Sequence, residues 1–129
     1  MKPIEVLLVE DSPAEVFLIR HLLAGELEPF QLHVAHDGSE AIEMMRSVEP
    51  DLIILDLKLP KVSGLSVLEE AHPHVPVVVF SASTSPADIQ RSFELGARDF
   101  VPKPSDLDSY KRLIAYIVRK WGKLEPALA

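Results

Sequence analysis

The sequence predicts an α/β fold in which five parallel strands alternate with five helices. The main support comes from three apolar runs, Ile4–Val9, Leu52–Leu55 and Val77–Phe80. Nearly continuous apolar runs of this length are typical of parallel strands that helices cover on both faces. The segments between them have helical patterns of roughly ten to sixteen residues. Strands that alternate with helices in this way form βαβ units, so we expect one parallel sheet.

Two weaker strand signals complete the set. The segment Gln31–Ala35 alternates between polar and apolar residues, which suits a strand at the edge of the sheet. The short segment Phe100–Val101 is the fifth candidate. Pro76 directly precedes the Val77–Phe80 run, a position where a strand needs no backbone donor.

Polar residues mark where the helices begin. Ser12, Pro13 and Glu15 form the pattern of an N-cap, a first-turn proline and a capping box. Ser85, Pro86 and Asp88 repeat this arrangement before the fourth helix. Similar signals begin the second and the last helix, at Asp37-Gly38-Ser39-Glu40 and Ser105-Asp106-Leu107-Asp108.

Right-handed crossovers leave few topologies for five such strands. The most economical is a flavodoxin-like, doubly wound sheet with the strand order 2-1-3-4-5, which places the first and third strands side by side. In open sheets of this kind, ligands bind at the carboxyl ends of the strands, near the point where the winding reverses. We therefore expect a functional site at that edge.

Composition sets limits on the class of protein. The 129 residues are enough for a single domain with a real core, which we expect to span residues 1–129. No apolar run approaches the roughly 18–20 residues of a membrane span, so we expect no membrane partner. The net charge of −7 argues against binding to nucleic acid, and the absence of cysteine makes a cytoplasmic location the default.

Five polar side chains follow the predicted strands at their carboxyl ends: Glu10, Asp11, Asp56, Ser81 and Lys103. Any one of them alone would more often be a solvated or capping residue. Because the fold brings all five to one edge, we interpret them together as a functional site. Three neighbouring carboxylates repel one another, and a Mg²⁺ ion, which prefers oxygen ligands, would relieve that repulsion.

This set of groups suits phosphoryl transfer, which depends on positioning and on charge neutralisation. Asp56 could give one oxygen to Mg²⁺ and attack a phosphorus atom with the other. The Lys103 ammonium would help to neutralise the phosphoryl charge, and the Ser81 hydroxyl could donate a hydrogen bond to a phosphoryl oxygen.

The same residues occur within segments that resemble the receiver domains of response regulators in two-component signalling. The matching segments span almost the whole chain: Val9-Glu10-Asp11, Asp56–Pro60 with Gly64, Ser81-Ala82, Gly96–Phe100 and Val101–Pro104. The resemblance implies that Asp56 accepts a phosphoryl group from a phosphohistidine on a sensor histidine kinase or a histidine phosphotransferase. It also implies that Glu10, Asp11, Asp56 and the backbone carbonyl of Lys58 hold Mg²⁺. In such domains, the residues that Ser81 and Phe100 match form a conformational switch, and the residue that Lys103 matches pairs with the phosphoryl group.

A narrower resemblance is to the stand-alone regulators that serve bacterial phytochrome kinases. It is based on Ser81–Ser85, Asp106–Tyr110, Trp121 and the long Gly25–Pro29 connection. It implies a homodimer that forms through the fourth helix, fifth strand and fifth helix. Only residues 123–129 follow the last predicted helix, so we also expect no output domain.

Three positions depart from the commonest receiver pattern. Ser81 stands where Thr is more frequent, Phe100 replaces a Tyr, and Lys58 is unusual two residues after the acceptor. Lys58 keeps open an alternative function, a phosphorylation-independent, receiver-like protein-binding module. It also argues against a dehalogenase-type phosphatase, which needs an acid there, so we expect no enzyme activity beyond the chain's own phosphorylation and dephosphorylation.

Two other kinds of ligand site are disfavoured. A flavodoxin-type flavin site is unsuited to this chain because Glu10 and Asp11 would repel the phosphate of FMN. We expect the histidines to be solvated rather than metal ligands, both on the predicted edge strand and in the loop before Pro76: His33, His36, His72 and His74.

Overall fold

The structure is a computed structural model that describes residues 3–26, 29–71, 73–83 and 85–122. Its five strands form one parallel sheet in the order β2-β1-β3-β4-β5. The strands are β1 (Ile4–Val9), β2 (Phe30–Ala35), β3 (Leu52–Leu55), β4 (Val77–Ser81) and β5 (Asp99–Pro102). This architecture and strand order confirm the predicted doubly wound fold.

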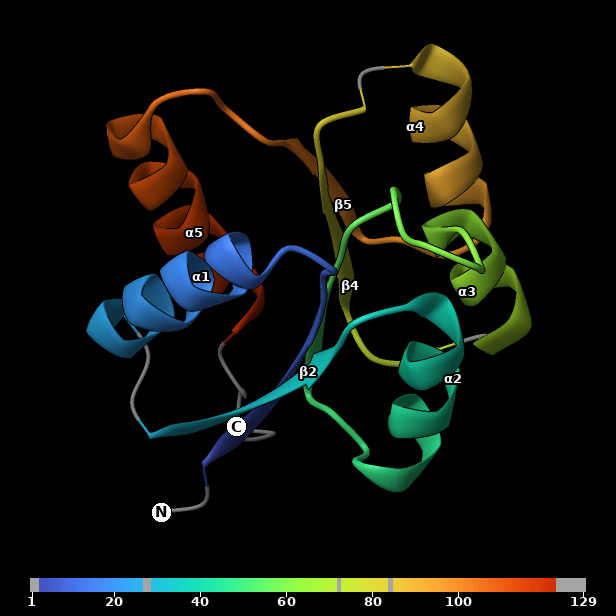
Figure 1. Cartoon of the computed structure of the whole chain (residues 1–129), viewed down its shortest axis with the longest axis horizontal. Helices are drawn as coiled ribbons and strands as arrows, with labels where there is room; N and C mark the ends of the chain where they lie inside the picture. The colour runs from blue at the N-terminus through green and yellow to red at the C-terminus, as the bar shows by residue number, and fades with distance from the viewer. Residues whose placement is uncertain (1–2, 27–28, 72, 84, 123–129) are drawn as a thin grey trace.

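Helices cover both faces of the sheet (Figure 1). They are α1 (Pro13–Glu26), α2 (Gly38–Ser47), α3 (Gly64–Ala71), α4 (Pro86–Glu94) and α5 (Leu107–Trp121). Helices α1 and α5 lie together on one face, and α2, α3 and α4 lie on the other. Among the described residues, no helix is both long enough and apolar enough to cross a membrane.

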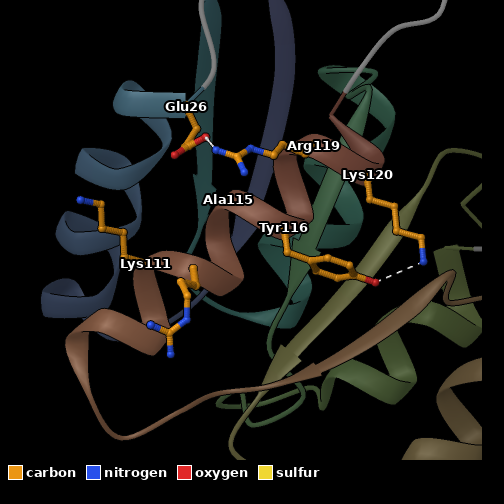
Figure 2. A pocket seen from close by; sticks show the side chains of 7 residues that line it. Glu26, Lys111, Ala115, Tyr116, Arg119 and Lys120 are labelled. Atoms are coloured by element: carbon orange, nitrogen blue, oxygen red, sulfur yellow. Dashed lines mark hydrogen bonds and ion pairs between the residues drawn. The ribbon is translucent and has the colours of Figure 1, made fainter.

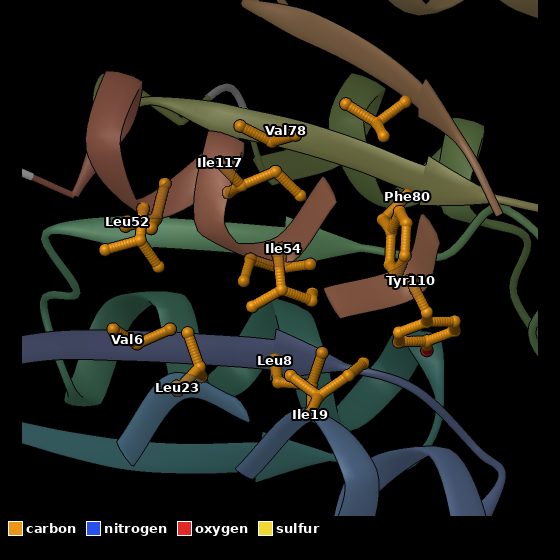
Figure 3. Packing of buried hydrophobic residues seen from close by; sticks show 13 residues of the cluster. Val6, Leu8, Ile19, Leu23, Leu52, Ile54, Val78, Phe80, Tyr110 and Ile117 are labelled. Carbon is orange, nitrogen blue, oxygen red and sulfur yellow. The ribbon is translucent and has the colours of Figure 1, made fainter. Parts of the chain in front are cut away.

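Two hydrophobic cores lie on the two faces of the sheet. The side chains of β1 alternate between them, with Val6 and Leu8 facing one core and Leu7 and Val9 facing the other. Figure 3 shows the first core, in which residues of α1 and α5 pack onto β1, β3 and β4. Burial of each large aliphatic side chain contributes about 1.5–3 kcal/mol, so the largely apolar strands β1, β3 and β4 hold the carboxyl edge in place.

The predicted helix starts are largely correct. Asp37, Ser85 and Asp106 are the N-caps of α2, α4 and α5, and each side chain accepts a hydrogen bond from the backbone three residues later. At α1, the Ser12 hydroxyl likewise accepts from the Glu15 amide at 3.3 Å. The predicted capping box also requires the Ser12 amide to donate a hydrogen bond to the Glu15 carboxylate. That part of the prediction is wrong, because the Ser12 amide donates to Glu10.

Two further expectations need correction. Strand β2 is an edge strand as predicted, but it begins at Phe30 rather than at Gln31. His33 is not simply solvated, because its Nε2 lies 2.6 Å from a carboxylate oxygen of Glu5 on the neighbouring strand. The pairing follows from the register of β1 and β2, which brings the two residues close together.

Gly64 holds the loop after β3 in place. Its amide donates to the Leu57 carbonyl at 3.0 Å. A Cβ at this position would lie only 2.6 Å from the Asp56 carbonyl oxygen and 2.6 Å from the Leu57 Cα, so no larger residue fits without movement of the backbone. The loop that carries Asp56 therefore packs directly against the start of α3.

Some of the sequence features lie outside the described residues. They are His72, Thr84, two positions of the Gly25–Pro29 connection and the segment 123–129.

Candidate functional site

The carboxyl edge of the sheet brings together the predicted site residues. Backbone hydrogen bonds extend the ladder one residue past the strands, from the Glu10 amide to Ala35 and from the Asp56 amide to Val9. The Lys103 amide donates to the Ser81 carbonyl at 2.9 Å. These bonds place Glu10, Asp56, Ser81 and Lys103 side by side on four adjacent chain segments.

Three carboxylates at this edge form a cluster that could hold a metal ion. One oxygen from each of Glu10, Asp11 and Asp56 lies within 4.8 Å of the others. Glu10 and Asp56 are buried, whereas Asp11 is exposed. A set of oxygen donors with one exposed member fits Mg²⁺ or Mn²⁺, which bind carboxylates and usually keep several waters.

Lys103 is the cation of the site. Its Nζ lies 2.7 Å from Glu10 Oε1, 2.9 Å from Asp56 Oδ2 and 2.9 Å from Glu15 Oε1. The ammonium also lies 5.9 Å from the centre of the Phe80 ring. Because the side chain is almost fully enclosed, each of these charge interactions is screened less by solvent than a surface ion pair would be.

Burial and the neighbouring charges shift the pKa values of Glu10 and Lys103. Burial raises the pKa of Glu10 to about 7, against the opposing hydrogen bond from Lys103, and the nearby charge of Asp56 raises it further. Burial alone would lower the pKa of Lys103, but its hydrogen bonds to Glu10, Asp56 and Glu15 hold that pKa above its ordinary value. Lys103 is therefore a permanent positive charge at neutral pH, whereas Glu10 can take up a proton.

Both carboxylate oxygens of Asp56 have partners. Oδ1 accepts a hydrogen bond of 3.0 Å from the Lys58 amide, and Oδ2 accepts the bond from Lys103. These two bonds fix the orientation of the carboxylate at the end of β3. The Lys58 side chain is exposed beside it.

Ser81 and Phe100 lie on adjacent strands. Ser81 is fully buried at the end of β4, and its hydroxyl accepts a 3.3 Å hydrogen bond from the Ser83 amide. Phe100 pairs with Val79 in the sheet and is partly buried against the core beside α2 and α3. Ser81 is two residues after Val79 on β4, and alternate residues of a strand share a face. Since Val79 pairs with Phe100, Ser81 and Phe100 lie on the same face of the sheet.

Two residues of the site were not among the candidates from the sequence, Glu15 and Tyr110. Glu15 Oε1 accepts a 2.8 Å hydrogen bond from the Tyr110 hydroxyl in addition to its ion pair with Lys103. In the sequence, Glu15 has the position of a capping residue and Tyr110 belongs to an apolar stripe of the last helix. No local signal separates these roles from a role in the site, since the contacts join segments 95 residues apart.

Comparisons with known proteins give a consistent result. Residues 6–115 match the family model of the response regulator receiver domain. The crystal structure of the Mn²⁺-bound response regulator Rcp1 superposes with a TM-score of 0.86 at 30% identity, and the match covers 98% of this chain and 100% of that one. The phosphorylated cyanobacterial phytochrome response regulator RcpA also gives a TM-score of 0.86, at 32% identity over 93% of this chain and 94% of that one.

A curated relative is similar over only part of its own length. The transcriptional regulatory protein TrcR of Mycobacterium tuberculosis is 36% identical over 126 residues, which cover 95% of this chain. The match covers 48% of TrcR, so this chain spans about half the length of that relative.

Proposed function

This chain belongs to the family of response regulator receiver domains, and on that premise we propose that Asp56 accepts a phosphoryl group from a phosphohistidine of a sensor kinase or a phosphotransferase. The main support is the position of the Lys103 ammonium, 2.9 Å from Asp56 Oδ2, in a cluster of carboxylates of which Glu10 and Asp56 are buried. A carboxylate oxygen of Asp56 would attack the phosphorus atom. The P–N bond to the donor imidazole would break, and the imidazole would leave with the electron pair.

The acidic cluster suits a divalent cation. Glu10, Asp11 and Asp56, joined by the backbone carbonyl of Lys58, would hold Mg²⁺, which when bound supplies neutralisation of the phosphoryl charge. Lys103 would contribute a second positive charge at the other side of Asp56. The similarity to the Mn²⁺-bound Rcp1 and to the phosphorylated RcpA is consistent with both parts of this proposal.

The response to phosphorylation would be a shift between two conformations. In this proposal the Ser81 hydroxyl turns from the Ser83 amide toward the phosphoryl group, and Phe100, on the same face of the sheet, moves inward as Ser81 moves. Beyond its own phosphorylation and dephosphorylation, the chain would carry no enzyme activity. It would act in the cytoplasm, with residues 1–129 folded as a single receiver domain.

The surface formed by α4, β5 and α5 is our candidate for signalling, through a partner protein or a homodimer. Phe93 on α4 is 46% exposed and Tyr116 on α5 is 39% exposed, which leaves two aromatic rings available to a partner. Figure 2 shows a groove of about 610 Å³ on the outer side of α5, at the edge of this surface. It lies between α5 and the end of α1, and its lining consists of Glu26 of α1 and of Lys111, Arg112, Ala115, Tyr116, Arg119 and Lys120 of α5. The similarity to RcpA favours a bacterial phytochrome as the kinase.

Intact mass spectrometry tests the phosphoacceptor. The protein is incubated with acetyl phosphate, with and without Mg²⁺, beside the variants Asp56→Asn and Asp108→Asn; the latter alters an exposed acid at the start of α5. We expect the wild type and Asp108→Asn to gain one phosphoryl group in the presence of Mg²⁺, and Asp56→Asn to gain none. Absence of a gain in the wild type would favour the alternative function, a phosphorylation-independent binding module.

Sedimentation velocity tests the homodimer. The variant Phe93→Ser removes an aromatic ring from the proposed surface, and Phe17→Ser removes one from α1, where the ring is 74% exposed. We expect the phosphorylated wild type and Phe17→Ser to sediment as dimers and Phe93→Ser to shift toward the monomer. A wild type that stays monomeric when phosphorylated would leave partner binding as the output.

A further inference from the structure

Glu15 joins the phosphoacceptor site to two helices. It lies in the first turn of α1, and its Oε1 lies 2.9 Å from the Lys103 Nζ at the end of β5 and 2.8 Å from the Tyr110 hydroxyl on α5. The side chain does not cap its own helix, because the Ser12 amide has Glu10 as its acceptor. The carboxylate is therefore committed to tertiary contacts.

Tyr110 holds this carboxylate in position. Tyr110 is buried, and its ring packs edge-on against Phe80, with the ring centres 5.1 Å apart and an interplanar angle of 78° (Figure 3). A buried hydroxyl needs an acceptor, and Glu15 provides it. Burial and this hydrogen bond keep the pKa of Tyr110 above its ordinary value, so the hydroxyl remains a donor.

The three carboxylates that contact Lys103 differ in what else they can bind. Glu10 and Asp56 belong to the cluster that could hold a cation, together with Asp11, whereas Glu15 is not part of that cluster. A cation at the cluster would compete with Lys103 for Glu10 and Asp56. Glu15 would then be the carboxylate that still attracts Lys103, and it would draw the ammonium away from Asp56.

We propose that Glu15 is a positioning residue that restrains Lys103. A phosphoryl group on Asp56 must displace the Glu15 carboxylate from the Lys103 ammonium. This inference depends on the proposed function. A phosphoryl group carries about two negative charges and three acceptor oxygens, so it competes effectively with one carboxylate for the ammonium. The negative charge of Glu15 opposes the arriving phosphoryl group, and its hold on Lys103 withholds the neutralising charge. Both effects slow the phosphorylation of Asp56.

The test compares labelling rates with acetyl phosphate and Mg²⁺ in four proteins: the wild type, Glu15→Gln, Tyr110→Phe and Glu43→Gln. Glutamine keeps an acceptor for Tyr110 and Lys103 but removes the charge. Phenylalanine at position 110 keeps the charge of Glu15 and removes the hydroxyl group that donates a hydrogen bond to it. Glu43 is an exposed acid on α2, and its variant controls for the change in net charge.

We expect Glu15→Gln to be labelled at least about threefold faster than the wild type, since it removes a charge close to the phosphoryl site. Tyr110→Phe should be no faster than the wild type, because the Glu15 carboxylate keeps its charge and its ion pair with Lys103. Glu43→Gln should match the wild type. The ¹⁵N signal of the Lys103 ammonium should also move in metal-free Glu15→Gln and not in Glu43→Gln, which reports on the ion pair itself.

The outcomes are distinguishable. A labelled wild type with Glu15→Gln equally fast or slower would overturn the role of Glu15 and leave the proposed function standing. Equal acceleration in Glu15→Gln and Tyr110→Phe would also overturn it, because loosening of the contact between α1 and α5 would then explain both. A wild type that takes no phosphoryl group would overturn the proposed function itself, and the role of Glu15 with it.

Discussion

The Nζ of Lys103 lies 2.9 Å from Oδ2 of Asp56, although 47 residues separate them in the chain. The contact depends on the backbone bond from the Lys103 amide to the Ser81 carbonyl, which continues the pairing of β4 and β5 beyond the last strand residue. One lysine thus neutralises part of a cluster of carboxylates at the carboxyl edge of the sheet. The charge balance of this cluster leads to the first three predictions.

Removal of the Lys103 charge should destabilise the metal-free protein. In Lys103→Met the carboxylates of Glu10, Glu15 and Asp56 lose their shared cation, so we expect the free energy of unfolding at pH 8 to fall by about 3 kcal/mol. The loss should be smaller at pH 6, where Glu10 is mostly protonated. Urea unfolding at the two pH values measures both.

Lys61→Met is the matched control for that variant. Lys61 also pairs with an aspartate, Asp37, but its side chain is 71% exposed and the two atoms are 3.5 Å apart. We expect no measurable change in stability from this variant. An equal loss in the two lysine variants would contradict the importance of burial at Lys103.

Protonation of Glu10 should make the metal-free protein more stable as the pH falls from 8 to 6. The folded-state pKa of about 7 lies above the ordinary value of 4.5, so the folded protein binds a proton in this range that the unfolded chain does not. The stability gained is complete below about pH 4.5 and is lost as the pH rises through 7, a change of about 1 kcal/mol between pH 6 and pH 8.

The contribution of Glu10 is isolated by comparison with Glu10→Gln, because both proteins share every other titrating group. The difference between their free energies of unfolding should change with pH over this range. For Glu43→Gln, the free energy of unfolding should follow the same pH dependence as that of the wild type. A constant difference between the wild type and Glu10→Gln would show that Glu10 stays ionised throughout.

Addition of Mg²⁺ should stabilise the protein. At a concentration ten times its dissociation constant, a ligand that binds only the folded state adds about 1.4 kcal/mol, which corresponds to a rise in Tm of roughly 4–7 °C for a domain of this size. Asp11→Asn should lose most of the rise, since it removes the exposed carboxylate of the cluster. Thermal unfolding with and without Mg²⁺ measures this, and an equal rise in Asp11→Asn would place the ion elsewhere.

A methyl group at Gly64 should disturb the phosphoacceptor loop. In Gly64→Ala the new Cβ would lie 2.6 Å from the Asp56 carbonyl oxygen, so the backbone must move, at a cost of about 1–3 kcal/mol. We also expect slower labelling of Asp56 by acetyl phosphate, because the carboxylate is carried by the displaced loop.

Gly25→Ala is the control for this glycine. Gly25 lies near the end of α1, where an added Cβ would meet nothing within 4 Å. Alanine should stabilise the helix by up to about 1 kcal/mol and leave labelling unchanged. Comparable losses in the two variants would mean that the contact of Gly64 with the loop is not the cause.

The sequence by itself determined the strands, their order and the acidic edge. The runs Leu52–Leu55 and Val77–Phe80 are apolar at every position, which is typical of strands that are covered on both faces. Polar residues directly after such strands must emerge at one edge, because parallel strands all end on the same side. Glu10, Asp56 and Lys103 could therefore be placed together from local patterns and the handedness of the crossovers alone.

Only the tertiary structure decided which partners these charges take. Glu15 has the sequence position of a capping residue, yet its carboxylate contacts Lys103 and Tyr110, and the Ser12 amide bonds to Glu10 instead. His33 pairs with Glu5 across the edge of the sheet. The physical reason is the same in both cases. A charged side chain selects among the partners that folding brings within about 3 Å, and those partners come from segments whose approach no local pattern encodes.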